Sequence, residues 1–204
     1  MVDRRTVLKL GAASAAGALI NVSATGLGAT ALGAIAPDSP RNPLSRAIFD
    51  GRSAEGLAFA SEMRGRGVAI SEVGTDLAKL WYSDLQPHLR KSPAPIAGLT
   101  DRATLFCLEE LARSVGMKVR YRVDHQADSI GHMQHDAAGP TSIVEAASKL
   151  YSRSGYGHTC SYGRTMAVLA SQFDPRESRE TDAQKRTGPF SPEGTTVLVS
   201  WVIA

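Results

Sequence analysis

The regular alternation of strand-like and helix-like segments between residues 46 and 124 is the feature that most constrains the fold. Short apolar runs typical of strands occupy residues 46–50, 68–73 and 95–99. Segments with helical spacing of their apolar residues follow each run, at 53–66, 75–87 and 100–116. This order predicts an α/β fold with a single open, mainly parallel sheet flanked by helices in three layers, in Rossmann-like or flavodoxin-like strand order.

The second half of the chain continues this pattern less regularly. Residues 117–124 alternate apolar with basic residues, which predicts a half-exposed strand near a sheet edge. Residues 142–151 are expected to form a helix, and residues 165–173 a helix or a strand. The polar stretch over 174–194 is expected to be a solvated loop, and the apolar run over 196–203 a buried final strand.

The first residues of the chain carry a paired arginine, Arg4-Arg5, followed by Val7-Leu8-Lys9 and an uncharged, weakly hydrophobic stretch from Leu10 to Ala36. This segment resembles the twin-arginine signal, although Asp3 stands where Ser or Thr is usual and Val7 where Phe is usual. The resemblance implies export of the folded chain by the twin-arginine translocase to the periplasm. Cleavage of the signal and its retention as an amino-terminal anchor are both left open, and no stable membrane span is expected.

The rest of the chain divides into two parts. Residues 37–43 form a proline-rich tether, and residues 44–204 are expected to fold as a single α/β domain. Segments over 55–60, 80–85 and 97–100 look like those of small exported bacterial proteins of unassigned activity, a resemblance that brings no catalytic residues with it.

Charge and cysteine content exclude two classes of protein. The net charge of +3 falls close to zero once Arg4, Arg5 and Lys9 are set aside with Asp3, so nucleic acid is not an expected partner. The 2 cysteines are too few for a disulfide-built scaffold. Cys107 is expected to be buried in the helix over 100–116, and its pairing with Cys160 stays open.

Polar groups follow the first predicted strand, where open α/β sheets bind ligands at the carboxyl ends of their strands. Asp50, Arg52 and Ser53 place an arginine at a helix amino terminus, an arrangement that can hold a carboxylate or a phosphate. The alternative is a turn in which Asp50 or Ser53 only caps the helix.

The ends of two further strands suggest a catalytic site. Thr100 and Asp101 follow the third strand, and His125 follows the strand over 117–124. A neutral imidazole at this edge can act as a general base or acid, with Asp101 or Asp124 orienting it. The alternative is an exposed histidine that closes a strand.

A histidine cluster predicts a metal site. His132, His135, His158 and Cys160 are residue types that bind first-row transition metals. The spacing of His132 and His135 suits a turn or a helix, although this spacing is frequent by chance. The alternative is a loop with solvated histidines, and no cofactor is otherwise implied.

These features favour an exported accessory or ligand-binding protein, associated with a periplasmic redox enzyme. The alternative is a small-metabolite enzyme that uses His125 with Asp50, Arg52 and Thr100, with a metal if the histidine cluster holds one. An enzyme should gather these residues around one pocket. An accessory protein should expose an apolar patch, with Trp81, Tyr82 or Trp201 as its expected members.

The export signal can be tested directly. Replacing the pair by lysines (Arg4→Lys with Arg5→Lys) should leave the precursor in the cytoplasm, because the translocase reads the arginine pair itself. Cell fractionation and immunoblotting measure the periplasmic share, and an undiminished share in the double variant would contradict the prediction.

Overall fold

Seven strands form one sheet in the computed structural model, which describes residues 43–127, 132–151, 161–189 and 197–204. Residues 40–204 form one compact unit. The signal segment and most of the tether lie outside the described residues, so export stays a prediction. Among the residues described, no helix is long and apolar enough to cross a membrane.

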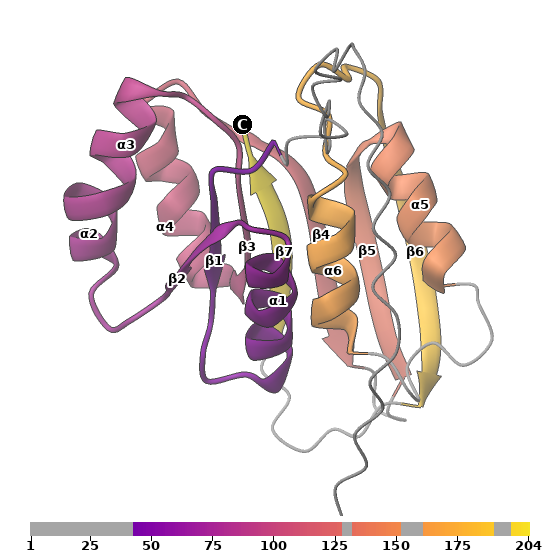
Figure 1. The fold of residues 1–204 in the computed structure, drawn as a ribbon. Helices are drawn as coiled ribbons and strands as arrows, with labels where there is room; N and C mark the ends of the chain where they lie inside the picture. The colour runs from indigo at the N-terminus through magenta and orange to yellow at the C-terminus, as the bar shows by residue number, and fades with distance from the viewer. Residues whose placement is uncertain (1–42, 128–131, 152–160, 190–196) are drawn as a thin grey trace, which may run out of the picture. The chain divides into compact units, whose positions relative to one another are not determined.

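The elements follow one another in the order that Figure 1 labels. The strands are β1 Arg46–Phe49, β2 Ala69–Glu72, β3 Ile96–Asp101, β4 Val119–Ala127, β5 His132–Pro140, β6 Glu180–Pro189 and β7 Leu198–Ile203. The helices are α1 Ala54–Gly65, α2 Leu77–Leu80, the π-helical turn η1 Trp81–Leu85, α3 Gln86–Lys91, α4 Arg102–Arg113, α5 Thr141–Tyr151 and α6 Tyr162–Ala170.

The sheet is mixed and mostly antiparallel, with the strand order β2-β1-β3-β7-β4-β5-β6. Only β1 with β2 and β1 with β3 pair in parallel, whereas the β3–β7, β7–β4, β4–β5 and β5–β6 pairs are antiparallel. The α/β fold with helices on both faces of one open sheet is confirmed, but the prediction of a mainly parallel sheet is wrong. The reason is that β7 inserts between β3 and β4, and β4, β5 and β6 continue the sheet as antiparallel neighbours.

Two further predictions for the second half are wrong. The basic, alternating strand lies inside the sheet as β4, between β7 and β5, and not near an edge. It alternates because Tyr121 and Val123 point into the core, while Arg120 and Arg122 lie on the opposite face, where none of the described helices lies over β4. The stretch expected to be a loop contains β6, whose polar sequence reflects its position at the sheet edge.

Two hydrophobic cores lie on opposite faces of the sheet. Helices α1, α5 and α6 cover one face, with Phe59, Ile143 and Met166 among the buried side chains. Segments α2 to α4 cover the other face over β1, β3 and β7, with Trp81 and Leu108 in that core. Each helix therefore turns its apolar side toward the sheet, as its spacing of apolar residues predicts.

Trp201 ties β7 to β3 on the α4 face. It lies opposite Gly98, and a Cβ atom at Gly98 would come within 2.2 Å of the indole ring. The indole Nε1 donates a hydrogen bond to Thr100 Oγ1 at 3.0 Å. The absence of a side chain at Gly98 therefore lets a large ring pack directly on the neighbouring strand.

Helix α4 provides a test of this packing. Leu108 is fully buried, so Leu108→Ala should lower the free energy of unfolding by about 2–5 kcal/mol through lost burial and the cavity left behind. Phe106, on the same helix, is 63% exposed, so Phe106→Ala should change it by less than about 0.5 kcal/mol. Denaturant unfolding compares the two variants, and equal losses would contradict the placement of α4.

Candidate functional site

His125 lies inside β4, close to its carboxyl end, and its side chain is buried. It forms two hydrogen bonds of 2.7 Å: Nε2 with Ser200 Oγ, and Nδ1 with His135 Nδ1. We call Ser200, His125 and His135 the serine–histidine cluster. The alternative of an exposed histidine that closes a strand is therefore wrong, because His125 is buried and β4 extends two residues beyond it, to Ala127.

Three neighbouring strands bring the cluster together. His125 pairs directly with His135 of β5, and Ser200 of β7 pairs with Val123 on the other side of β4. All three cluster residues lie within three positions of a strand end, at the edge where β3 and β4 finish and β5 and β7 begin. The cluster thus lies near the carboxyl ends of β3 and β4, as ligand sites do in open α/β sheets.

Two tyrosines from the covering helices hold the imidazole rings. Tyr151 of α5 stacks on His135, with ring centroids 4.2 Å apart and an angle of 7° between the planes. Tyr162 of α6 lies over His125 at a centroid distance of 4.6 Å. These contacts fix both rings between the sheet and the helices.

Helix α6, which carries Tyr162, is fixed by α1. The Glu55 carboxylate accepts hydrogen bonds from the backbone N–H of Gly163, at 2.7 Å, and from the Ser161 hydroxyl. A Cβ atom at Gly163 would lie 2.0 Å from the Glu55 carbonyl oxygen, so only glycine permits this approach of the two helices. The negative carboxylate at the amino terminus of α6 also matches the positive end of the helix dipole.

The short contacts within the cluster require a defined order of protons. Only one proton can lie between the two Nδ1 atoms, so one imidazole donates and the other accepts. If His125 carries its proton on Nδ1, its Nε2 accepts a hydrogen bond from the Ser200 hydroxyl. If His135 donates instead, His125 Nε2 carries a proton and donates to Ser200 Oγ.

Burial keeps both imidazoles neutral. It lowers the pKa of His125 well below 6.5, and the nearby His135 lowers it further. Burial also lowers the pKa of His135 to about 4, although the negative charge of Asp136 opposes this effect. The cluster therefore has uncharged ring nitrogens that can accept hydrogen bonds at neutral pH.

The residues predicted after the first strand form a closed ion-pair group. Arg52 contacts both carboxylate oxygens of Asp50, through Nε to Oδ1 at 2.9 Å and Nη2 to Oδ2 at 2.7 Å, and its Nη2 also reaches Asp101 Oδ2 at 3.1 Å. The hydrogen bonds from Arg52 hold the pKa of Asp50 below its usual range. Ser53 caps α1 by accepting from the N–H groups of Glu55 and Gly56. This geometry favours the capping alternative over an open anion site.

Thr100 and Asp101 form their hydrogen bonds with residues other than His125. Asp101 caps α4 through Thr104 N, at 2.7 Å, and Thr100 is bonded to Trp201. Trp201 follows Ser200 in β7, so the two side chains point to opposite faces of the sheet, Trp201 with Thr100 and Ser200 with His125. The predicted convergence of His125, Arg52 and Thr100 around one pocket is therefore wrong.

Comparison with known proteins does not assign a family. No protein-family model, curated protein or solved structure matches this chain. The serine–histidine cluster is therefore interpreted from its geometry alone.

The predicted metal ligands are not gathered in the described part of the chain. His132 and His135 lie in β5, where burial alternates, so their side chains point to opposite faces instead of sharing a turn or a helix. His158 and Cys160 lie outside the described residues. The described residues contain no group of three or more potential ligands.

Cys107, expected in the core, is exposed on α4, because Leu105 and Leu108 take the inward positions.

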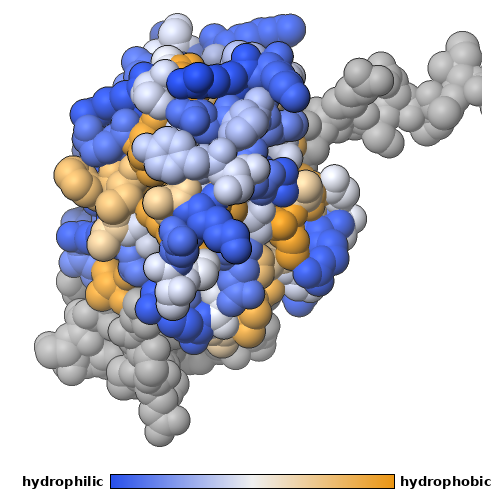
Figure 2. Space-filling model, turned by 90° about the vertical axis from the view of Figure 1, so that its left-hand side faces the viewer, coloured by the Kyte–Doolittle hydropathy of each residue, from blue (hydrophilic) through white to orange (hydrophobic). Residues whose placement is uncertain are grey.

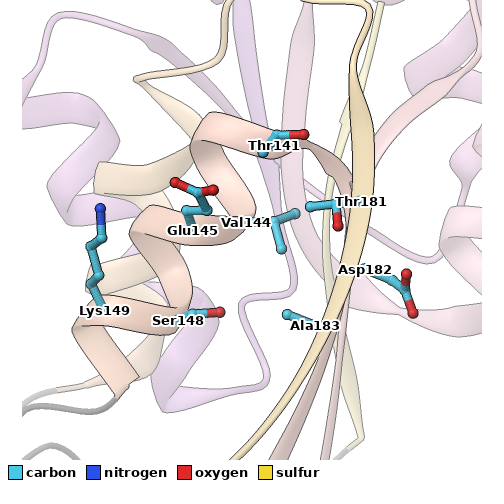
Figure 3. Close-up of a pocket in the computed structure, with 8 residues that line it drawn as sticks. All are labelled: Thr141, Val144, Glu145, Ser148, Lys149, Thr181, Asp182 and Ala183. Atoms are coloured by element: carbon cyan, nitrogen blue, oxygen red, sulfur yellow. The ribbon is translucent and has the colours of Figure 1, made fainter.

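A separate groove lies between α5 and β6, with a volume of about 330 Å³. Figure 3 shows Val144 of α5 beside Thr181 of β6 and Ser148 across from Ala183, while Asp182 points away to the other side of the sheet. The groove is lined by Thr141, Val144, Glu145, Ser148, Lys149, Thr181, Asp182 and Ala183. None of the cluster residues lines it, so it is a second surface feature.

Ser200 is the site residue that the sequence patterns did not reveal. Its signal is a single hydroxyl within the apolar run Leu198–Ile203, every residue of which is buried. A buried hydroxyl needs a hydrogen-bond partner, so it should direct attention to polar groups on adjacent strands. The strand order, which the patterns do not supply, is needed to identify that partner as His125.

Acid should destabilise the protein through this cluster. An unfolded histidine takes up a proton near pH 6.5, whereas folded His135 resists protonation until about pH 4. The stabilisation is therefore present above pH 6.5 and is lost as the pH falls toward 4, by roughly 3 kcal/mol for His135. Denaturant unfolding between these pH values measures the slope.

Two variants separate this effect from general acid sensitivity. His135→Phe keeps a ring against Tyr151 and should flatten the slope, whereas His88→Gln, at an exposed position of α3, should leave it unchanged. Equal slopes in the wild type and His135→Phe would show that the cluster does not resist protonation.

Proposed function

We propose that this chain is an exported enzyme that transfers or hydrolyses small acyl groups, with Ser200 as the nucleophile. The observation that carries the proposal is a chain of two hydrogen bonds, each 2.7 Å long, that joins Ser200 Oγ to His125 and His125 to His135. In activated nucleophiles, a hydroxyl lies within hydrogen-bond distance of a base, and a third group orients that base.

Each member of the cluster has a role that follows from its atoms. Ser200 Oγ attacks the acyl carbon and its proton passes to His125 Nε2, which then gives the proton to the departing alcohol. Water attacks the acyl-serine in the second half, loses a proton to the same nitrogen and restores the hydroxyl. His135 acts as a positioning residue, because its Nδ1 accepts a hydrogen bond from the Nδ1–H of His125 and so holds His125 in the tautomer whose Nε2 is free to take the serine proton.

Burial shapes this chemistry in two ways. It keeps His125 unprotonated at neutral pH, but the same burial makes the imidazolium costly, so the hydrogen bond that His125 Nδ1 donates to His135 has to offset that cost. Ser200 is 2% exposed, so a substrate reaches it only after a local opening. A small ester fits this constraint, whereas a polymer does not.

Labelling with a fluorophosphonate probe tests the nucleophile without knowledge of the substrate. The probe should attach slowly to Ser200, and Ser200→Ala or His125→Gln should abolish the attachment, while Ser114→Ala, at the exposed C-cap of α4, should not. Intact-mass and peptide mass spectrometry measure the extent and the site.

His135→Gln gives a further readout. It should slow labelling by about tenfold and steepen its dependence on pH, because His125 loses the partner that orients it. Unlabelled wild-type protein after long incubation, or labelling that persists in Ser200→Ala, would overturn the proposal.

An accessory role for the exported protein is the second proposal, and the surface supports it less than the cluster supports the enzyme. Tyr82 is 58% exposed and is the one expected member of an apolar patch on the surface, since Trp81 and Trp201 are buried. Figure 2 shows hydrophobic residues in several separate groups on the side of α2 and α3, between hydrophilic ones. This surface gives a partner less continuous apolar area than the accessory role was expected to show.

A further inference from the structure

Strand β6 forms one edge of the sheet and is long for an edge strand. It spans Glu180–Pro189 and, among the described residues, pairs only with β5. An edge strand of this length carries a row of backbone N–H and C=O groups on its outer side, which can pair with another strand.

The order of charges along β6 is suited to one partner in particular. Glu180 and Asp182 come first, and Lys185 and Arg186 follow. In an antiparallel pair of two identical strands, the first half of each strand lies opposite the second half of the other, so acids meet bases. A parallel partner with the same sequence would place like charges opposite one another, which is destabilising.

We propose that β6 pairs antiparallel with β6 of a second copy of this chain, so that two sheets join into one. The contact is a symmetric dimer interface, because the same strand serves both copies. A pairing centred on Gln184 places Asp182 opposite Arg186 of the second copy, and a pairing centred on Ala183 places Glu180 opposite it. Both registers oppose one acid to one base, twice per dimer.

The groove beside β6 supports this choice of partner. Val144 and Ala183 form an apolar floor next to the strand edge, and α5 bounds the groove on one side (Figure 3). A two-fold axis perpendicular to the joined sheet would place α5 of both copies on the same face, one on each side of the β6 pair. The second copy would therefore shield the open side of the groove.

The same charges have a competing explanation. Charged residues on an edge strand can prevent pairing with other chains. The two explanations differ in what a charge reversal does: a protective charge gives a monomer, whereas complementary charges give a dimer that one reversal weakens and a second reversal restores.

Sedimentation velocity of the full chain over a range of concentrations tests the proposal. The wild type should dimerise, and Arg186→Glu should raise the dissociation constant by about tenfold, because it opposes two acids in either register. Adding Asp182→Arg should restore the dimer if the pairing is centred on Gln184, and adding Glu180→Arg should restore it if the centre is Ala183.

Arg90→Glu, the same charge change at an exposed position of α3, is the matched control and should leave the dimer unchanged. Thermal unfolding of each variant verifies that the chain remains folded. A wild type that stays monomeric at every concentration would overturn the proposal. So would a dimer whose dissociation constant is unchanged by Arg186→Glu and by the added Asp182→Arg or Glu180→Arg.

Discussion

The pairing of β7 with both β3 and β4 is the interaction on which the rest of the structure depends. β7 is buried along its whole length and forms antiparallel ladders on its two sides. No other described strand connects the parallel group β2-β1-β3 with the antiparallel group β4-β5-β6. The two faces of β7 also serve different purposes, since Trp201 packs on Gly98 in one core and Ser200 meets His125 in the other.

Local patterns in the sequence determine much of this fold, because they report which side of each element is buried. Helices α1 and α4 could be predicted from their apolar spacing and their caps, Ser53 and Asp101. The alternation in β4 correctly indicated that one face of the strand lies outside the core. A strand inside the sheet with one polar face and a strand at the sheet edge have the same alternating sequence. Only the insertion of β7, a pairing between residues far apart in sequence, distinguishes them.

The candidate site shows the same division between local and non-local information. His125 could be singled out because it lies near the carboxyl end of a strand, yet its partners, Ser200 and His135, are defined by strand order. The position of Arg52 could be interpreted from neighbouring residues alone, because it forms its ion pair with Asp50, two residues earlier in the chain. Short-range contacts of this kind are available in any strand order, whereas the serine–histidine cluster exists only in the observed one.

The position of β7 also affects how the chain can acquire its structure during synthesis. The other strands that the structure describes leave the ribosome before residues 198–203, so β3 and β4 each have one unpaired side until β7 is made. These temporary edges carry unpaired backbone N–H and C=O groups of strands that lie inside the finished sheet, and they are prone to pair with other chains while they are exposed. A nascent chain of this topology therefore exposes two strand edges until β7 closes the gap between the two halves.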